Sequence, residues 1–361
     1  MASPKTAGKT KQKKRSFHQE LVLNRWVMRF FKGNELAALK LRLGDDQHEG
    51  IDEDGQTLFF HELTRNLFEV DWISEADLRR YDLHIVEHWQ AITKHRNQLE
   101  GHVLNMKYFQ YLSLLFTEIY LDWYFTKPQA LLDGLNEELA TYSKEQGAEI
   151  FQPYIASDLN KIAFWNATGS GKTLLLHVNI KQYLHYFQAG NSNLYPDKII
   201  LLTPNEGLSK QHLEELELSG FSFSRFFDKN RTNTFKGTIE IIDINKLGDS
   251  MGDKTVAVEA FEGNNLVLVD EGHRGTGTAA GAWMQRRDAL VRGGFAFEYS
   301  ATFGQAVAKG NTVAKAEEEL LKKKAKTLFE TTALKKLDDA QLAQLVLTQV
   351  EQRQARVTAT R

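Results

Sequence analysis

Residues 162–176 read IAFWNATGSGKTLLL, and this stretch decides the fold. The apolar run Ile162–Trp165 leads into a glycine-rich loop, which leads into a second apolar run beginning at Leu174. This order predicts a strand, a loop and a helix. Gly169 and Gly171 let backbone N–H groups approach phosphate oxygens closely, and the first turn of the helix directs its positive dipole end at them. The stretch therefore predicts a phosphate-binding loop at the end of a buried strand.

The side chains of the loop predict what it binds. Lys172 can reach the β- and γ-phosphates of a nucleotide, and the Thr173 hydroxyl can ligate Mg²⁺. A loop of this kind can also be merely structural, but the strand before it and the helix after it favour a nucleotide site. We expect ATP and Mg²⁺ as ligands, with the nucleotide held by Ala167, Thr168, Gly169, Ser170, Gly171, Lys172 and Thr173.

A pair of acidic residues ends another apolar run. Leu266–Val269 is followed by Asp270, Glu271, Gly272 and His273. In open α/β sheets ligands bind at the carboxyl ends of the strands, so both carboxylates can turn into the same crevice as the loop. Asp270 would hold Mg²⁺ through its water shell, and Glu271 would orient or deprotonate the attacking water. The alternative is a solvated strand end, which the loop upstream disfavours.

Short apolar runs alternate with helix-like segments over residues 149–304, which we expect to form one ATP-binding domain. The runs are Ile162–Trp165, Ile199–Thr203, Ile239–Ile244, Leu266–Val269 and Phe295–Ser300. Such alternation indicates an α/β fold, in which helices cover both faces of a parallel sheet.

Helix-like sequence flanks this domain on both sides. Apolar residues at helical spacing predict a mostly helical domain at 17–148, with an acidic loop at 44–55 and a helix break at Lys127–Pro128. The acidic loop lacks the order of carboxylates found in an EF-hand, so we expect no calcium there. Residues 305–361 alternate acidic and basic clusters, which predicts an exposed helical tail.

Composition excludes several classes of protein. With no cysteine, the chain has no disulfide framework and no thiol chemistry. No apolar run approaches the ~18 residues of a membrane span, and no apolar segment of a signal peptide follows the basic amino terminus, so we expect a cytoplasmic protein without a membrane partner. Residues 1–16 form a basic arm, which either contacts nucleic acid phosphates or is a solvated tail. Its cations are Lys5, Lys9, Lys11, Lys13, Lys14 and Arg15.

The order of motifs resembles that of superfamily 2 helicases of the DEAD/DEAH type. Residues 168–173 resemble motif I, 203–208 with Gln211 motif Ia, 270–273 motif II, and 300–302 motif III. Among these proteins the chain most resembles the Res subunits of type III restriction enzymes. The resemblance covers about residues 150–305 and implies a RecA-like P-loop domain. Asn166 and Gly272 depart from the residues usual in motifs I and II, but neither change removes a catalytic side chain.

The resemblance also implies roles for residues outside the phosphate site. Thr203 would touch the nucleic acid backbone, while His273, Ser300 and Thr302 would couple hydrolysis to strand movement. Arg274 begins a loop of small residues and would contact a phosphate of the nucleic acid, although a simple connector explains that loop equally well.

Two classes of function fit these observations. We expect an ATP-driven translocase that acts on double-stranded DNA in a restriction or phage-defence system, with a modification or specificity subunit as a partner; an RNA helicase is the alternative enzyme. The other class is a nucleotide-dependent binding module without motor activity. No strand-like run and no arginine-bearing motif VI follow Thr302, so we expect slow hydrolysis unless a partner or a continuation of the chain supplies a second RecA-like lobe.

Weaker patterns predict structure instead of chemistry. The sequence from His84 to His88 fits the H-x-x-E-H pattern of some zinc peptidases, but we expect these two histidines on a solvated helix face, opposite a buried stripe that includes Leu83. We expect His177, His185 and His212 at the surface of helices. The aromatic clusters around Trp72, Trp89 and Trp123 are expected mainly in the core, with base stacking as the alternative.

Overall fold

The computed structural model describes residues 21–32, 36–67, 72–146, 152–191, 193, 195–228, 235–248, 256–257, 261, 263–271 and 287–302. The basic arm at 1–16, the tail at 305–361 and the loop that contains Gly272, His273 and Arg274 lie outside these residues.

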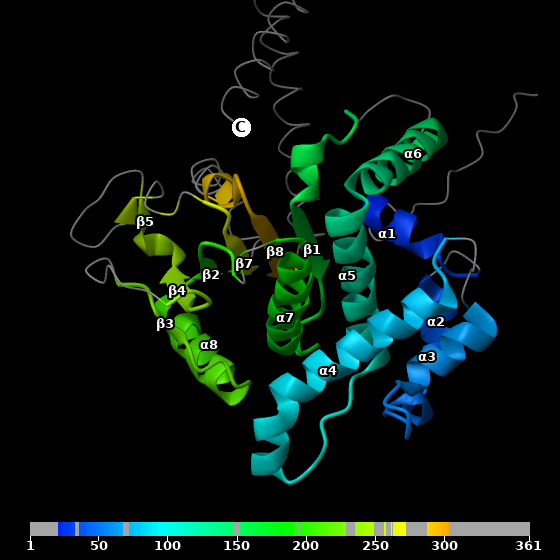
Figure 1. Ribbon diagram of the computed structural model, residues 1–361, viewed down its shortest axis with the longest axis horizontal. Coiled ribbons are helices and arrows are strands. Elements are labelled where there is room, and N and C mark those ends of the chain that lie inside the picture. Colours follow the sequence, from blue (N-terminus) through cyan, green and yellow to red (C-terminus); the bar gives the residue numbers. More distant parts are fainter. Residues whose placement is uncertain are drawn as a thin grey trace, which may run out of the picture.

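A six-stranded parallel sheet forms the centre of the fold (Figure 1). Its strands, in spatial order, are β1 (Lys161–Trp165), β8 (Phe295–Ser300), β7 (Leu266–Asp270), β2 (Ile199–Thr203), β4 (Ile239–Asp243) and β3 (Ser224–Phe226). The α/β class and all five strands expected from the sequence are therefore confirmed. Strand β3 and the short parallel pair β5 (Leu247–Gly248) and β6 (Val256–Ala257) lack a long apolar run, which explains why the sequence pattern did not reveal them.

Apolar cores on both faces explain why the central strands read as unbroken hydrophobic runs. Ile199 and Leu201 of β2 pack into the large core cluster, which includes helix α7 (Lys172–Gly190). Ile200 and Leu202 point the other way, into a smaller cluster with Val267 and Val269 of β7.

A helical region precedes the sheet, as the sequence predicts. Its elements are α1 (Val22–Met28), α2 (Leu36–Leu43), η2 (Asp46–His48), α3 (Leu58–Glu62), η3 (Leu63–Leu67), α4 (Glu75–Glu100), α5 (Tyr108–Thr126), α6 (Pro128–Gln146) and η4 (Ala156–Leu159). The expected break is confirmed, because α5 ends at Thr126 and α6 begins at Pro128. Within the sheet region the other helical elements are α8 (Glu206–Leu218), η5 (Ile244–Lys246) and a turn of helix at 287–291.

The helical region packs directly against the helix that follows the phosphate loop. In Figure 1, α5 lies beside α7, and α4 crosses below α7 towards α8. At this contact the fully buried carboxylate of Glu118 on α5 accepts hydrogen bonds from Gln182 Nε2 at 2.7 Å and from the Tyr186 hydroxyl at 2.6 Å, both on α7. Burial raises the pKa of Tyr186, and the charge of Glu118 adds to the effect, so the phenol keeps its proton and donates.

Helix α4 does not have the predicted arrangement of one buried apolar stripe opposite one solvated polar face. His88 is buried, whereas Leu83 is 41% exposed, so the expected solvated histidine face and buried leucine are wrong. The reason is that α4 contacts α3, α5, α7 and α8, so its buried surface is wider than one stripe. No group of three or more His, Asp or Glu residues within the described ranges is arranged to hold a metal ion.

The aromatic clusters largely belong to the core. Trp89 and Trp123 are buried, and the Trp89 indole N–H donates to the Leu104 carbonyl oxygen at 2.8 Å. Trp72 is 43% exposed and lies beneath the Arg29 guanidinium. Across the described part of the chain, no helix combines the length and the apolar character needed to cross a membrane.

The Glu118 contact yields a prediction about stability. Replacing Glu118 by Ala removes the acceptor of Gln182 and Tyr186, and a buried donor left without its partner costs about 1–3 kcal/mol. We therefore expect Glu118→Ala to lower the free energy of unfolding by about 2–4 kcal/mol in urea denaturation, and Glu118→Gln, which keeps an acceptor and the volume, to lower it less. An alanine variant as stable as the parent chain would show that this carboxylate does not hold α5 to α7.

Candidate nucleotide-binding site

The parallel register brings four strand ends to one edge of the sheet. Trp165 of β1 pairs with Ser300 of β8, and Tyr299 of β8 pairs with Asp270 of β7. On the other side of β7, Val269 pairs with Leu202 of β2. The residues at and just after these strand ends, which the sequence singles out as motifs I, II, III and Ia, therefore share the carboxyl edge, where ligands of open α/β sheets bind.

The glycine-rich loop leaves β1 and enters α7 with backbone conformations that suit glycine. Gly169 and Gly171 have φ angles of 77° and 79°, in the left-handed region that disfavours a side chain. Gly171 caps α7 without a side-chain hydrogen bond, so the amide groups of the first turn, which begins at Lys172, have no capping side chain. The loop is tied to the neighbouring strand because the Asn166 N–H donates to the Ser300 carbonyl oxygen at 3.2 Å.

Two buried polar atoms at the loop suit a polar ligand. Asn166 Nδ2 and Ser170 Oγ are inaccessible to solvent and have no hydrogen-bond partner among the described residues. Together with the uncapped first turn of α7, these groups fit the phosphates of a nucleotide. Asn166, which departs from the usual residue at its position, thus has a buried amide nitrogen without a partner among the described residues.

The helical region touches the phosphate loop through Gln110, which the sequence analysis did not identify. Gln110 lies in the first turn of α5; its Oε1 accepts from the Lys107 N–H at 2.9 Å and its Nε2 donates to the Ser170 carbonyl oxygen at 3.0 Å. A Cβ atom on Gly171 would lie 2.5 Å from Gln110 Nε2, so the side chain closes over the loop. Gln110 and Ser170 are 60 positions apart, and no local sequence pattern relates them.

The acidic pair lies at the end of β7. Asp270 is the last residue of the strand, and Glu271 follows it with a φ of 56°, which is uncommon for a residue other than glycine. The imidazole of His212, on α8, lies 3.0 Å from Asp270, measured from Nε2 to Oδ2. His212 is 4% exposed and His177 is fully buried, so the expected surface positions of both residues are wrong. Burial lowers the pKa of His177 to about 3, which keeps its ring neutral near pH 7.

The segment 300–302 begins at the last residue of β8, the strand that lies between β1 and β7 in the sheet. Ser300 is buried, and its Oγ accepts a hydrogen bond from the Thr302 N–H at 3.0 Å. The Trp165 indole N–H, at the end of β1, donates to the Ala301 carbonyl oxygen at 3.0 Å. These contacts hold the segment against the end of β1.

Thr203 lies at the same edge, but its side chain is 1% exposed and its hydroxyl is 2.5 Å from Ser209 Oγ. The hydroxyl therefore does not face a solvent-accessible surface in this arrangement, and its role towards nucleic acid stays a prediction. The other expected contact residue, Arg274, and the expected coupling residue His273 lie outside the described residues.

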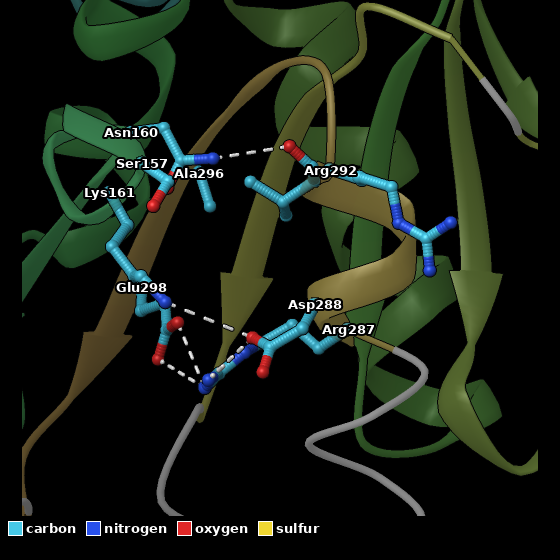
Figure 2. A pocket seen from close by; sticks show the side chains of 9 residues that line it. Ser157, Asn160, Lys161, Arg287, Asp288, Arg292, Ala296 and Glu298 are labelled. Carbon is cyan, nitrogen blue, oxygen red and sulfur yellow. Dashed lines mark hydrogen bonds and ion pairs between the residues drawn. The ribbon is translucent and has the colours of Figure 1, made fainter. Parts of the chain in front are cut away.

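A separate cavity of about 180 Å³ lies towards the amino ends of β1 and β8 (Figure 2). Burial raises the pKa of its Glu298, and the nearby Arg287 guanidinium, 2.9 Å away, opposes that effect. Arg287 also lies 3.2 Å from Asp288, which in turn is 3.9 Å from Lys161. The charges here are largely paired with one another and lie away from the carboxyl edge.

A parallel sheet whose carboxyl edge gathers a phosphate loop and an acidic pair defines a RecA-like P-loop domain. The sequence model of the family described as "Type III restriction enzyme, res subunit" matches residues 125–305, just over half of the chain. The chain belongs to this family of superfamily 2 helicases and carries its ATPase lobe.

Solved structures with detectable similarity include two complexes of S. cerevisiae Dbp5 variants. One is bound to RNA and ADP BeF3, with 20% identity and a TM-score of 0.27 over 43% of this chain and 39% of that chain. The other is bound to Nup159, Gle1, IP6 and ADP, with 18% identity and a TM-score of 0.28 over 47% of this chain and 48% of that chain. The chain thus spans less than half the length of these relatives. No curated protein matches the chain.

Proposed function

We propose that the carboxyl edge of the sheet binds Mg-ATP and hydrolyses it to drive movement along double-stranded DNA. The observation that carries this proposal is the register that brings the phosphate loop, Asp270 and Glu271 to one edge through β8. The restriction-enzyme family to which the chain belongs supports DNA as the track and a restriction or phage-defence system as the setting.

The residues of the loop would bind the phosphates. Backbone N–H groups of 169–173 approach the phosphate oxygens, and the Lys172 ammonium neutralises charge on the β- and γ-phosphates. Asn166 Nδ2 and Ser170 Oγ, which are buried and have no partner among the described residues, would add donors beside the loop. Binding would thus depend mainly on Lys172 and the backbone, and little on the exposed side chains of Ala167 and Thr168.

Magnesium would be held by the Thr173 hydroxyl and, through water, by the Asp270 carboxylate. When bound, the ion neutralises phosphate oxygens and stabilises the charge that develops during transfer. Glu271 would orient the attacking water and accept its proton. Because Glu271 directly follows the last residue of β7, its backbone is anchored beside the metal carboxylate.

Coupling of hydrolysis to movement would involve Ser300, Thr302 and His273. The first two lie in the segment that contacts the end of β1 and continues from Tyr299, the partner of Asp270, so they can respond to changes at the loop and at the acidic pair. Arg274 and Thr203 are proposed contacts for nucleic acid. A second RecA-like lobe and a modification or specificity subunit are the proposed partners.

Two substitutions separate binding from chemistry. Lys172→Ala should abolish binding of a fluorescent ATP analogue because it removes the charge that holds the phosphates, and Lys161→Ala, at the opposite end of β1, should leave binding unchanged. Glu271→Gln should keep the affinity and stop hydrolysis, because it retains the shape of the side chain and removes the base. Normal turnover by a folded Lys172→Ala protein would exclude this site, and a loss of affinity in Glu271→Gln would exclude the proposed role of Glu271.

The nature of the track is tested by the ATPase rate in the presence of different nucleic acids. Duplex DNA should stimulate hydrolysis more than single-stranded DNA or RNA of equal length, with Glu271→Gln as the control for contaminating activity. Stimulation by RNA alone would favour an RNA helicase. A nucleotide-dependent binding module would bind ATP and nucleic acid without stimulation by any of the three.

A further inference from the structure

Helix α8 presents a buried stripe of Ser209, His212 and Leu216 towards the interior. His212, in the middle of this stripe, reaches the end of strand β7, where its Nε2 lies 3.0 Å from Asp270 Oδ2. The side chains of His212 and Asp270 are 6% and 14% exposed, so the contact is shielded from solvent. It therefore joins the helix after β2 to the carboxylate at the end of β7.

The direction of this hydrogen bond follows from its chemistry. An ionised carboxylate only accepts, so the imidazole N–H at Nε2 donates. The other ring nitrogen, Nδ1, is buried and has no hydrogen-bond partner among the described residues. The bond to Asp270 is therefore the hydrogen bond that orients the His212 ring, and in return the ring restrains the Asp270 carboxylate.

We propose that His212 is a positioning residue for the magnesium carboxylate: it holds Asp270 by one oxygen, Oδ2, and so leaves Oδ1 to accept from the water shell of the ion. This inference rests on the proposed function of Asp270. Removing a group that orients a metal-binding carboxylate in this way typically lowers the affinity for the metal by about 10–100-fold.

Other contacts fix α8 along its length. They thereby fix the position of His212, which contacts Asp270. Ser209, near its start, lies 2.5 Å from the Thr203 hydroxyl at the end of β2. Glu215 accepts from the Arg96 guanidinium of α4 at 2.6 Å. Because α8 begins in the segment proposed to contact nucleic acid, His212 provides a direct connection from that segment to the metal carboxylate.

The test measures how strongly Mg²⁺ increases the affinity for a fluorescent ATP analogue, without reference to turnover. His212→Leu removes the donor and keeps bulk, and we expect it to raise the half-saturating Mg²⁺ concentration by about tenfold or more while affinity without Mg²⁺ stays unchanged. His212→Gln, whose amide nitrogen reaches to the position of Nε2, should restore most of the effect. The shorter His212→Asn should not, and it provides a second variant if the leucine protein does not fold.

The matched control is His177→Leu. His177 is a buried, neutral histidine on α7 whose Nδ1 lies 2.8 Å from Ser219 Oγ at the end of α8. This substitution makes the same change of side chain near the same helix, but it removes the contact with Ser219 and does not touch Asp270, so the Mg²⁺ dependence should stay that of the parent chain. An equal shift in His177→Leu, or the parent dependence in folded His212→Leu and His212→Asn proteins, would overturn the positioning role. If the parent chain itself bound the analogue without any effect of Mg²⁺, the proposed function of Asp270 would fail as well.

Discussion

The site depends on one geometric constraint, the parallel pairing of β1, β8, β7 and β2 in register. Parallel strands end at the same edge, and side chains at these ends therefore converge although the chain separates them widely. Strand β8 is central to this arrangement, because it pairs with the strand before the phosphate loop and with the strand before the acidic pair. A shift of β8 by one residue would exchange the side chains that face the two cores and would break the hydrogen bond that joins Asn166 to Ser300.

The helical region adds a second constraint, because it touches both helices that lead away from this edge. It holds α7 through the buried Glu118 and holds α8 through the ion pair of Arg96 with Glu215. It also reaches the phosphate loop itself through Gln110. The surroundings of the candidate nucleotide site therefore include helical residues that precede the part of the chain matched by the family model, residues 125–305.

The sequence predicts the parts of this arrangement that depend on local order. Five strands follow from apolar runs, and the phosphate loop follows from glycines between a strand and a helix. Contacts between distant residues have no such signal, and His212 and Asp270 are 58 positions apart. From the sequence alone, His212 is expected at a helix surface and Asp270 at the end of a strand, with nothing that relates the two. The burial of His88 and His177 was missed for a related reason, since a helix packed against several neighbours buries more than the one face that periodicity reveals.

The most direct test of whether these four strand ends form one site is amide hydrogen exchange of the whole chain. Exchange is compared with and without an Mg²⁺-bound non-hydrolysable ATP analogue. We expect slower exchange on ligand binding at 166–173, 203–208, 270–271 and 300–302 together, because a ligand at the shared edge restrains all four segments. Exchange in the segments around Lys161 and Arg287 should stay unchanged. Protection that included only one of the four ends, or that appeared at the cavity of Lys161 and Arg287 instead, would contradict this expectation.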